Sequence, residues 1–142
     1  MKDSRDRIFA IASALAVAVG LIAGWSMMGG RGIQRSLEAD RLRVSALRAM
    51  AVQARSIATR QDGPHAPADR SELVKTLSVY QTADPETADP YEYKRVSDSE
   101  FSLCATFSLP TEQSESRYQG QFWTHPAGYH CYQFDLKQSW PW

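Results

Sequence analysis

The chain has 142 residues, of which 16 are basic and 16 are acidic, so its formal net charge is zero. A neutral chain without a basic run has no electrostatic footprint for nucleic acid, and we expect no nucleic-acid partner. The length allows one small domain beside a terminal segment, but not two domains.

An uncharged stretch from Ile8 to Met28 dominates the N-terminal part of the sequence. As a helix, its 21 residues would reach roughly 31 Å, about the hydrocarbon thickness of a bilayer. The stretch is longer than the apolar core of a signal peptide, and no small-x-small cleavage site follows it. It therefore predicts an uncleaved transmembrane helix over residues 8–28, preceded by a short cytoplasmic tail over residues 1–7.

Small residues recur at every fourth position of this stretch, which places them on one helix face: Ala12, Ala16, Gly20 and Gly24. Such a face lets a second helix approach closely, although alanine and glycine are also common in membrane helices in general. We interpret it as a candidate helix-packing face. Trp25 stands where an interfacial aromatic residue is expected, and it is a candidate contact with a partner or with the interface.

Basic residues flank the predicted span on both sides, and more of them follow it than precede it. That count would place the following domain inside the cell. The two cysteines favour the opposite orientation, because their predicted pairing persists only in an oxidising compartment. The sequence therefore predicts a single-pass protein of the bacterial inner membrane, with a periplasmic C-terminal domain.

The glycine-rich run at 29–33 predicts a hinge, because glycine weakens a helix. From Gln34 to about Arg60 the chain lacks Gly and Pro and carries apolar residues at helical spacing. This pattern predicts a long amphipathic helix that packs against a sheet or a neighbouring helix. The helix would open an extracytoplasmic α+β domain over residues 34–142.

The C-terminal half carries signals for a short helix and three strands. Asp69 can act as an N-cap with Glu72 three residues later, a capping-box arrangement that predicts a short second helix. Three later runs alternate with a period of two and predict antiparallel strands: Tyr91–Val96, Glu100–Leu109 and Tyr129–Leu136. The short connection between the first two runs predicts a hairpin.

A single register accounts for the last two predicted strands. If Cys104 lies opposite Cys131, the apolar residues fall on one face of the sheet and the cysteines on the other. The opposed pairs on the apolar face would be Phe101 with Phe134, Leu103 with Tyr132, and Ala105 with His130. Opposed residues on neighbouring antiparallel strands are close enough for a disulfide. The sequence therefore predicts a Cys104–Cys131 disulfide.

The run Asp89-Pro90-Tyr91-Glu92-Tyr93 is followed by a hairpin into Phe101-Ser102-Leu103. This run resembles the D-x-x-G-x-P-Y-x-Y segment and following strand of type II secretion pseudopilins and related type IV pilin-like proteins. The resemblance implies a pilin-like α+β fold, in which a membrane helix and an amphipathic helix precede a small antiparallel sheet. Residues 7–12 lack the Gly-Phe-Thr-Leu-x-Glu type cleavage motif of pilin precursors, so we extend the resemblance to the fold and not to pilus function.

No residue pattern in the chain indicates catalysis. The serines lie in no recognisable activating context, and no glycine-rich loop of the phosphate-binding type is present. His125 and His130, together with the two cysteines, are the strongest candidate metal ligands, but their spacing fits no standard zinc pattern. We predict a protein that is not an enzyme, with no catalytic residue, no metal site and no cofactor.

The chain ends with two indoles around a proline, Trp140-Pro141-Trp142. Chain termini usually fray unless they are docked, so a terminal Trp140 and Trp142 are difficult to bury within their own domain. They are candidate contacts with a partner protein or with the membrane interface, and docking on their own domain is an open alternative.

Two functions remain open from the sequence. The first is a membrane-anchored, non-catalytic structural or accessory subunit. Its partners would be a membrane protein complex or its own copies in a homo-oligomer, held at the lipid bilayer. The alternative is a periplasmic sensory module that binds a ligand or a metal through the segment from His125 to Cys131.

Overall fold

The computed structural model describes residues 2–60, 63–111 and 120–138. Between residues 2 and 31 it describes the side chains at positions 11, 13–22 and 24. The chain divides into two compact units, Met1–Arg35 and Ser36–Trp142.

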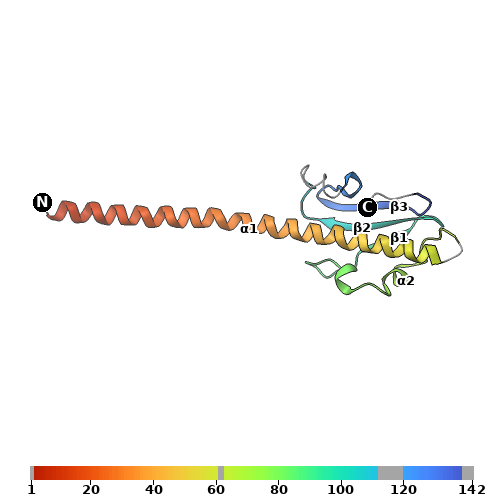
Figure 1. Ribbon diagram of the computed structural model, residues 1–142. Coiled ribbons are helices and arrows are strands. Elements are labelled where there is room, and N and C mark those ends of the chain that lie inside the picture. Colours follow the sequence, from red (N-terminus) through yellow and green to blue (C-terminus); the bar gives the residue numbers. More distant parts are fainter. Residues whose placement is uncertain (1, 61–62, 112–119, 139–142) are drawn as a thin grey trace. The chain divides into compact units, whose positions relative to one another are not determined.

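Helix α1 runs from Lys2 to Arg60 (Figure 1). Within the described part of the chain, no helix contains an apolar stretch long enough to cross a membrane. The predicted transmembrane helix over 8–28 is therefore wrong, and so is the single-pass inner-membrane localisation with a periplasmic domain that followed from it.

The glycine-rich run at 29–33, where a hinge was predicted, has helical backbone and lies inside α1. Glycine in a helix interior costs roughly 1 kcal/mol relative to alanine, which weakens a helix without forbidding it. The predicted end of the amphipathic helix near Arg60 is confirmed.

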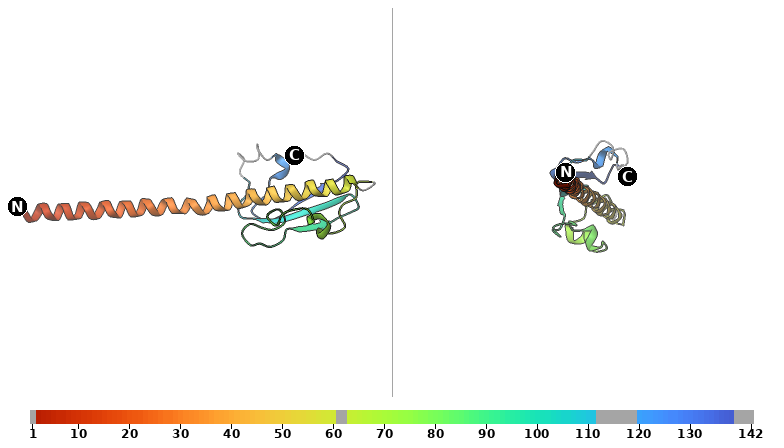
Figure 2. Two further views of the ribbon diagram at one scale, coloured as in Figure 1. Left: turned by 60° about the horizontal axis from the view of Figure 1, so that its bottom comes forward. Right: turned by 90° about the vertical axis from the view of Figure 1, so that its left-hand side faces the viewer.

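In the second unit, α1 lies along one face of a three-stranded sheet (Figure 2). Its buried side chains repeat at the spacing of three or four residues that defines one helix face: Val44, Leu47, Met50, Ala51 and Ala54. They pack in one core with large residues of the sheet, namely Phe101, Leu103, Phe107, Tyr132 and Phe134. The predicted amphipathic stripe is thus the face that this helix buries.

A short helix, α2, spans Arg70–Val74 and begins as predicted. The Asp69 carboxylate accepts a hydrogen bond of 3.0 Å from the backbone N–H of Glu72. The Glu72 carboxylate accepts one of 2.8 Å from the N–H of Ala68, one residue before the cap. Both bonds satisfy backbone donors at the helix start that would otherwise lack a partner. The helix then buries Leu73 in the core.

The predicted antiparallel meander is confirmed, with the strand order β1-β2-β3. The strands are β1 (Glu92–Arg95), β2 (Glu100–Phe107) and β3 (Gly128–Asp135). Two 3-10 turns complete the described elements: η1 (Val79–Gln81) and η2 (Gln121–Trp123). The hairpin between β1 and β2 closes through the carbonyl of Glu100, which accepts bonds from the N–H groups of Val96 and Ser97.

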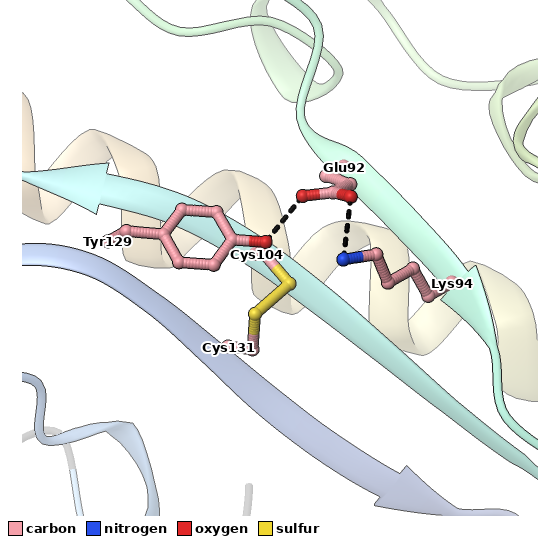
Figure 3. Close-up of a disulfide and its surroundings, with 5 residues drawn as sticks. All are labelled: Glu92, Lys94, Cys104, Tyr129 and Cys131. Atoms are coloured by element: carbon pink, nitrogen blue, oxygen red, sulfur yellow. Dashed lines mark hydrogen bonds and ion pairs between the residues drawn. A yellow bond between two sulfur atoms is a disulfide. The ribbon is translucent and has the colours of Figure 1, made fainter.

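The predicted register between β2 and β3 is also confirmed. Cys104 lies opposite Cys131, and the pairs Phe101–Phe134, Leu103–Tyr132 and Ala105–His130 follow from it. The two cysteines form a disulfide across a Cα–Cα distance of 4.0 Å. It lies on the face of the sheet opposite α1 (Figure 3).

We expect this disulfide to supply a large share of the stability of the second unit. It joins residues 27 apart in the sequence, and closing such a loop stabilises the fold by about 3.5 kcal/mol in the chain-entropy account. Urea unfolding should show that loss when both cysteines are replaced by alanine. A reducing agent should destabilise the natural protein and leave the double variant unchanged, and equal transitions with and without it would contradict the prediction.

Candidate functional site

Arg43, on α1, is the centre of a buried charged cluster. Its side chain is only 4% exposed, yet its guanidinium contacts three carboxylates. It donates to Asp40 at 2.7 Å, to Asp84 at 2.6 Å and to Glu86 at 2.6 Å. A second bond of 3.0 Å to Asp84 makes that pair bidentate, the strongest geometry for an arginine and a carboxylate. Arg43 therefore fastens the loop at 84–86 to the helix.

Asp40, one helical turn before Arg43, holds a different segment. Its carboxylate accepts hydrogen bonds of 2.9 Å from the backbone N–H groups of Ser108 and Leu109, just beyond the end of β2. Arg43 supports the same contact by donating to the Ser108 hydroxyl at 3.1 Å. Because Asp40 and Arg43 lie three residues apart, one face of α1 fixes both the end of β2 and the loop that precedes β1.

The electrostatics of the cluster follow from this geometry. Burial by itself would lower the pKa of Arg43, but its hydrogen bonds to Asp84, Glu86 and Asp40 outweigh burial and raise that pKa. Burial likewise opposes ionisation of Asp84. The bonds from Arg43 and from the N–H groups of Glu86 and Thr87 are stronger, and they hold the pKa of Asp84 below its usual range. Both shifts favour the charged forms, so Arg43 and Asp84 form an ion pair at neutral pH.

A cleft of about 460 Å³ borders this cluster at the edge of the sheet. The lining residues that bear on its chemistry are Arg43, Asp84, Asp89, Tyr91, Glu92 and Thr106. Tyr91 is 3% exposed, and burial raises the pKa of its hydroxyl. In the part of the chain that the structure describes, this hydroxyl has no hydrogen-bond partner.

On the face of the sheet opposite α1, polar side chains surround the disulfide (Figure 3). The Glu92 carboxylate accepts a hydrogen bond from the Tyr129 hydroxyl and forms an ion pair of 2.9 Å with Lys94. These two contacts, the bond from Tyr129 first, lower the pKa of Glu92. Since Tyr129 is on β3 and Glu92 on β1, their contact crosses the middle strand beside Cys104.

The candidate metal ligands do not converge. Both cysteine sulfurs are joined in the disulfide, and His125 stacks on Phe107 with ring centroids 3.7 Å apart. His130 lies edge-on to Tyr132, and burial lowers the pKa of its imidazole. Among the residues described here, no group of three His, Cys, Asp or Glu side chains could hold a metal ion.

The first unit presents an uncovered apolar helical segment at residues 11–22, here called the apolar segment. Its large side chains are between 61% and 69% exposed: Ile11, Leu15, Val17, Val19, Leu21 and Ile22. On the predicted packing face, Ala16, Gly20 and Gly24 are exposed as well. A Cβ atom added at Gly20 or Gly24 would meet nothing within 4 Å. The chain itself therefore leaves room for another helix at these positions.

The other sequence candidates lie outside the described residues or side chains. The side chains of Ala12 and Trp25 belong to the undescribed part of α1, and Trp140 and Trp142 lie beyond residue 138. Their predicted contacts with a partner or an interface stay predictions.

Sequence reasoning missed the Arg43 cluster and treated this arginine as one of several scattered basic residues. A signal was available, because Asp40, Arg43 and Leu47 share the helical spacing of the buried stripe. An arginine inside an apolar stripe indicates a buried ion pair, and the aspartate three residues earlier is its nearest partner in sequence. The partners at Asp84 and Glu86 carry no such local signal.

Comparison of the chain with models of known protein families, with curated proteins and with solved structures found no match in any of the three.

We expect Arg43→Met to destabilise the second unit by about 3–5 kcal/mol, because it leaves buried carboxylates without their counter-charge. Arg41→Met is the matched control on the same helix. Arg41 is 53% exposed and lies 3.8 Å from Glu38, and exposed pairs of this kind contribute at most about 1 kcal/mol. Chemical unfolding of both variants measures the difference, and equal losses would contradict a structural role for the cluster.

We also expect a specific dependence on pH. The pKa of Asp84 is lowered by folding, so its charged form stabilises the fold above its unfolded pKa of about 3.9, and this contribution is lost as the pH falls through the folded value. Asp84→Asn keeps the size of the side chain, removes its charge and replaces one of its two acceptor oxygens by an NH2 group. The gap in unfolding free energy between the two proteins should be constant above about pH 5 and shrink below about pH 4. A gap that stays constant down to pH 2 would disagree with this account.

Proposed function

We propose that the protein is a non-catalytic structural or accessory subunit that associates through the apolar segment of α1 with helices of partner proteins or of further copies. The supporting observation is the exposure of six large apolar side chains within 12 residues, each at least 61% exposed. Contiguous exposed apolar surface of this kind marks an interaction site in a folded protein. Burying a valine, leucine or isoleucine contributes about 1.5–3 kcal/mol each, which gives association a strong driving force.

The distribution of large and small side chains around the apolar segment favours contact with more than one partner helix. At about 100° per residue, most of the large side chains group on one side of the apolar segment, with Ile11 and Ile22 near its centre and Val17 at its margin. The small residues Ala16, Gly20 and Gly24 group on the opposite side. One side of the segment can therefore bury large apolar side chains against a partner. The other side allows the close backbone approach that is typical of helix pairs with small residues at their contact.

The charged cluster favours a structural role over a catalytic one. All three carboxylates around Arg43 are held by its guanidinium at 2.6–2.7 Å. Such contacts fix segments of the fold, and they leave no carboxylate of the cluster poised as a free general base. The conclusion that the protein is not an enzyme stays part of the proposal.

The test is a pair of leucine substitutions on the small-residue side, Gly20→Leu with Gly24→Leu. Each change adds a side chain into open space and raises helix propensity by roughly 1 kcal/mol, so a loss of association cannot result from a melted helix. We expect the natural protein to sediment as an assembly or to co-purify with a partner. The double variant should shift to smaller species, because leucine blocks the close approach of a second helix.

Ala14→Leu with Ala18→Leu is the matched control, since these residues lie on the bulky side of the same segment. It should retain association. Far-UV circular dichroism and the intact Cys104–Cys131 disulfide report that the second unit stays folded in every variant. Unchanged assembly and unchanged partner recovery in the glycine double variant would refute the small-residue contact.

A further inference from the structure

The cleft beside Arg43 lies where the sheet is incomplete. β1 pairs with β2 only as far as Glu92 opposite Cys104, whereas β2 continues to Phe107 and pairs there with β3. Just before β1, Pro90 forms an isolated antiparallel bridge with Ala83. On the β1 side of Thr106, therefore, no strand among the described residues is present.

The register shows which main-chain groups face this gap. Cys104 and Cys131 have Cα atoms 4.0 Å apart, the short spacing of a non-hydrogen-bonded antiparallel pair. The N–H and C=O of Cys104 therefore point toward β1, and those of Thr106, two residues on, point the same way. The register of β1 ends at the Glu92–Cys104 pair, and Pro90, two residues before Glu92, has no N–H to donate to β2. The N–H and C=O groups of Thr106 therefore face the cleft and have no strand partner among the described residues.

A second feature of the cleft is the buried Tyr91 hydroxyl. Tyr91 lines the cleft, is 3% exposed and has no hydrogen-bond partner among the described residues. Arg43 and Asp84 line the same cleft. A buried hydroxyl without a partner is costly, and a ligand or water that reaches it relieves that cost.

The charges along the lining favour a cationic ligand. Three carboxylates, Asp84, Asp89 and Glu92, line the cleft against one guanidinium, that of Arg43, which gives a net charge of −2. Arg43 is already engaged by carboxylates, and Glu92 is shared with Lys94. Asp89 forms no ion pair with another described residue, and it is an exposed residue of the cleft lining next to Pro90.

We propose that this cleft binds an extended peptide of a partner protein that carries a lysine. The peptide main chain pairs with Thr106 and takes the place of the missing β1 residues, as in other cases of strand addition at a sheet edge. The lysine ammonium lies between Asp89 and Glu92, where it forms charge-assisted hydrogen bonds. The cleft volume of about 460 Å³ is within the range of small-ligand pockets.

The experiment uses the full chain and a dye-labelled blocked tripeptide, Val-Lys-Val, followed by fluorescence polarisation. Replacing the lysine by glutamine in the peptide should weaken binding roughly tenfold or more, because charge-assisted hydrogen bonds are lost. The protein variant Asp89→Asn with Glu92→Gln should weaken binding of the lysine peptide by a similar factor. Glu38→Gln, an exposed acidic residue outside the cleft, should change nothing.

Two further arms separate the contributions of main chain and hydroxyl. A peptide methylated on the lysine backbone nitrogen cannot donate a hydrogen bond to the Thr106 carbonyl, so it should bind more weakly. The protein variant Tyr91→Phe removes the hydroxyl but keeps the ring in the core, and it should also weaken binding. n-Butylamine supplies the ammonium group alone and should compete poorly. Equal binding of the lysine and glutamine peptides, full binding by the Asp89/Glu92 double variant, or n-butylamine competing as well as the peptide would overturn the proposal.

Discussion

The position of the sheet against α1 depends on one buried arginine. Arg43 and its neighbour Asp40 reach two segments that lie far apart in the sequence, the loop at 84–86 and the residues after β2. Buried ion pairs are costly to desolvate, so their value is often in specifying one arrangement rather than in adding stability. The hydrogen bonds of this cluster are directional, so they specify where α1 lies along the sheet.

The sheet is the part of the fold that its sequence predicts best. Alternation with a period of two separates residues that face α1, such as Phe101, from residues on the opposite face of the sheet, such as Cys104, and a slip of one residue would exchange the two sets. The cysteine pair then selects one register among the even-numbered alternatives. Local rules also predict the start of α2 at Asp69, because capping is decided within three or four residues.

The Arg43 cluster and the N-terminal part of α1 depend on information that a local sequence pattern does not contain. The partners of Arg43 lie 41 and 43 residues away, so only the folded chain identifies them. At 29–33 the backbone is helical despite the glycines, because propensity is a weak prior, and the predicted hinge there stays a prediction. The uncharged run from Ile8 to Met28 predicted a membrane span from hydropathy alone, and the structure does not support that reading in its described residues.

The strand order β1-β2-β3 has a consequence for how the chain folds. Each strand pairs with the next one in sequence, with 4 residues between β1 and β2 and 20 between β2 and β3. Pairing the strands therefore closes shorter loops than docking the helix does. The contacts of Asp40 and Arg43, at separations of 41 to 69 residues, are the slow ones by the same argument. The three-stranded meander can therefore form first, and α1 then packs onto the completed sheet.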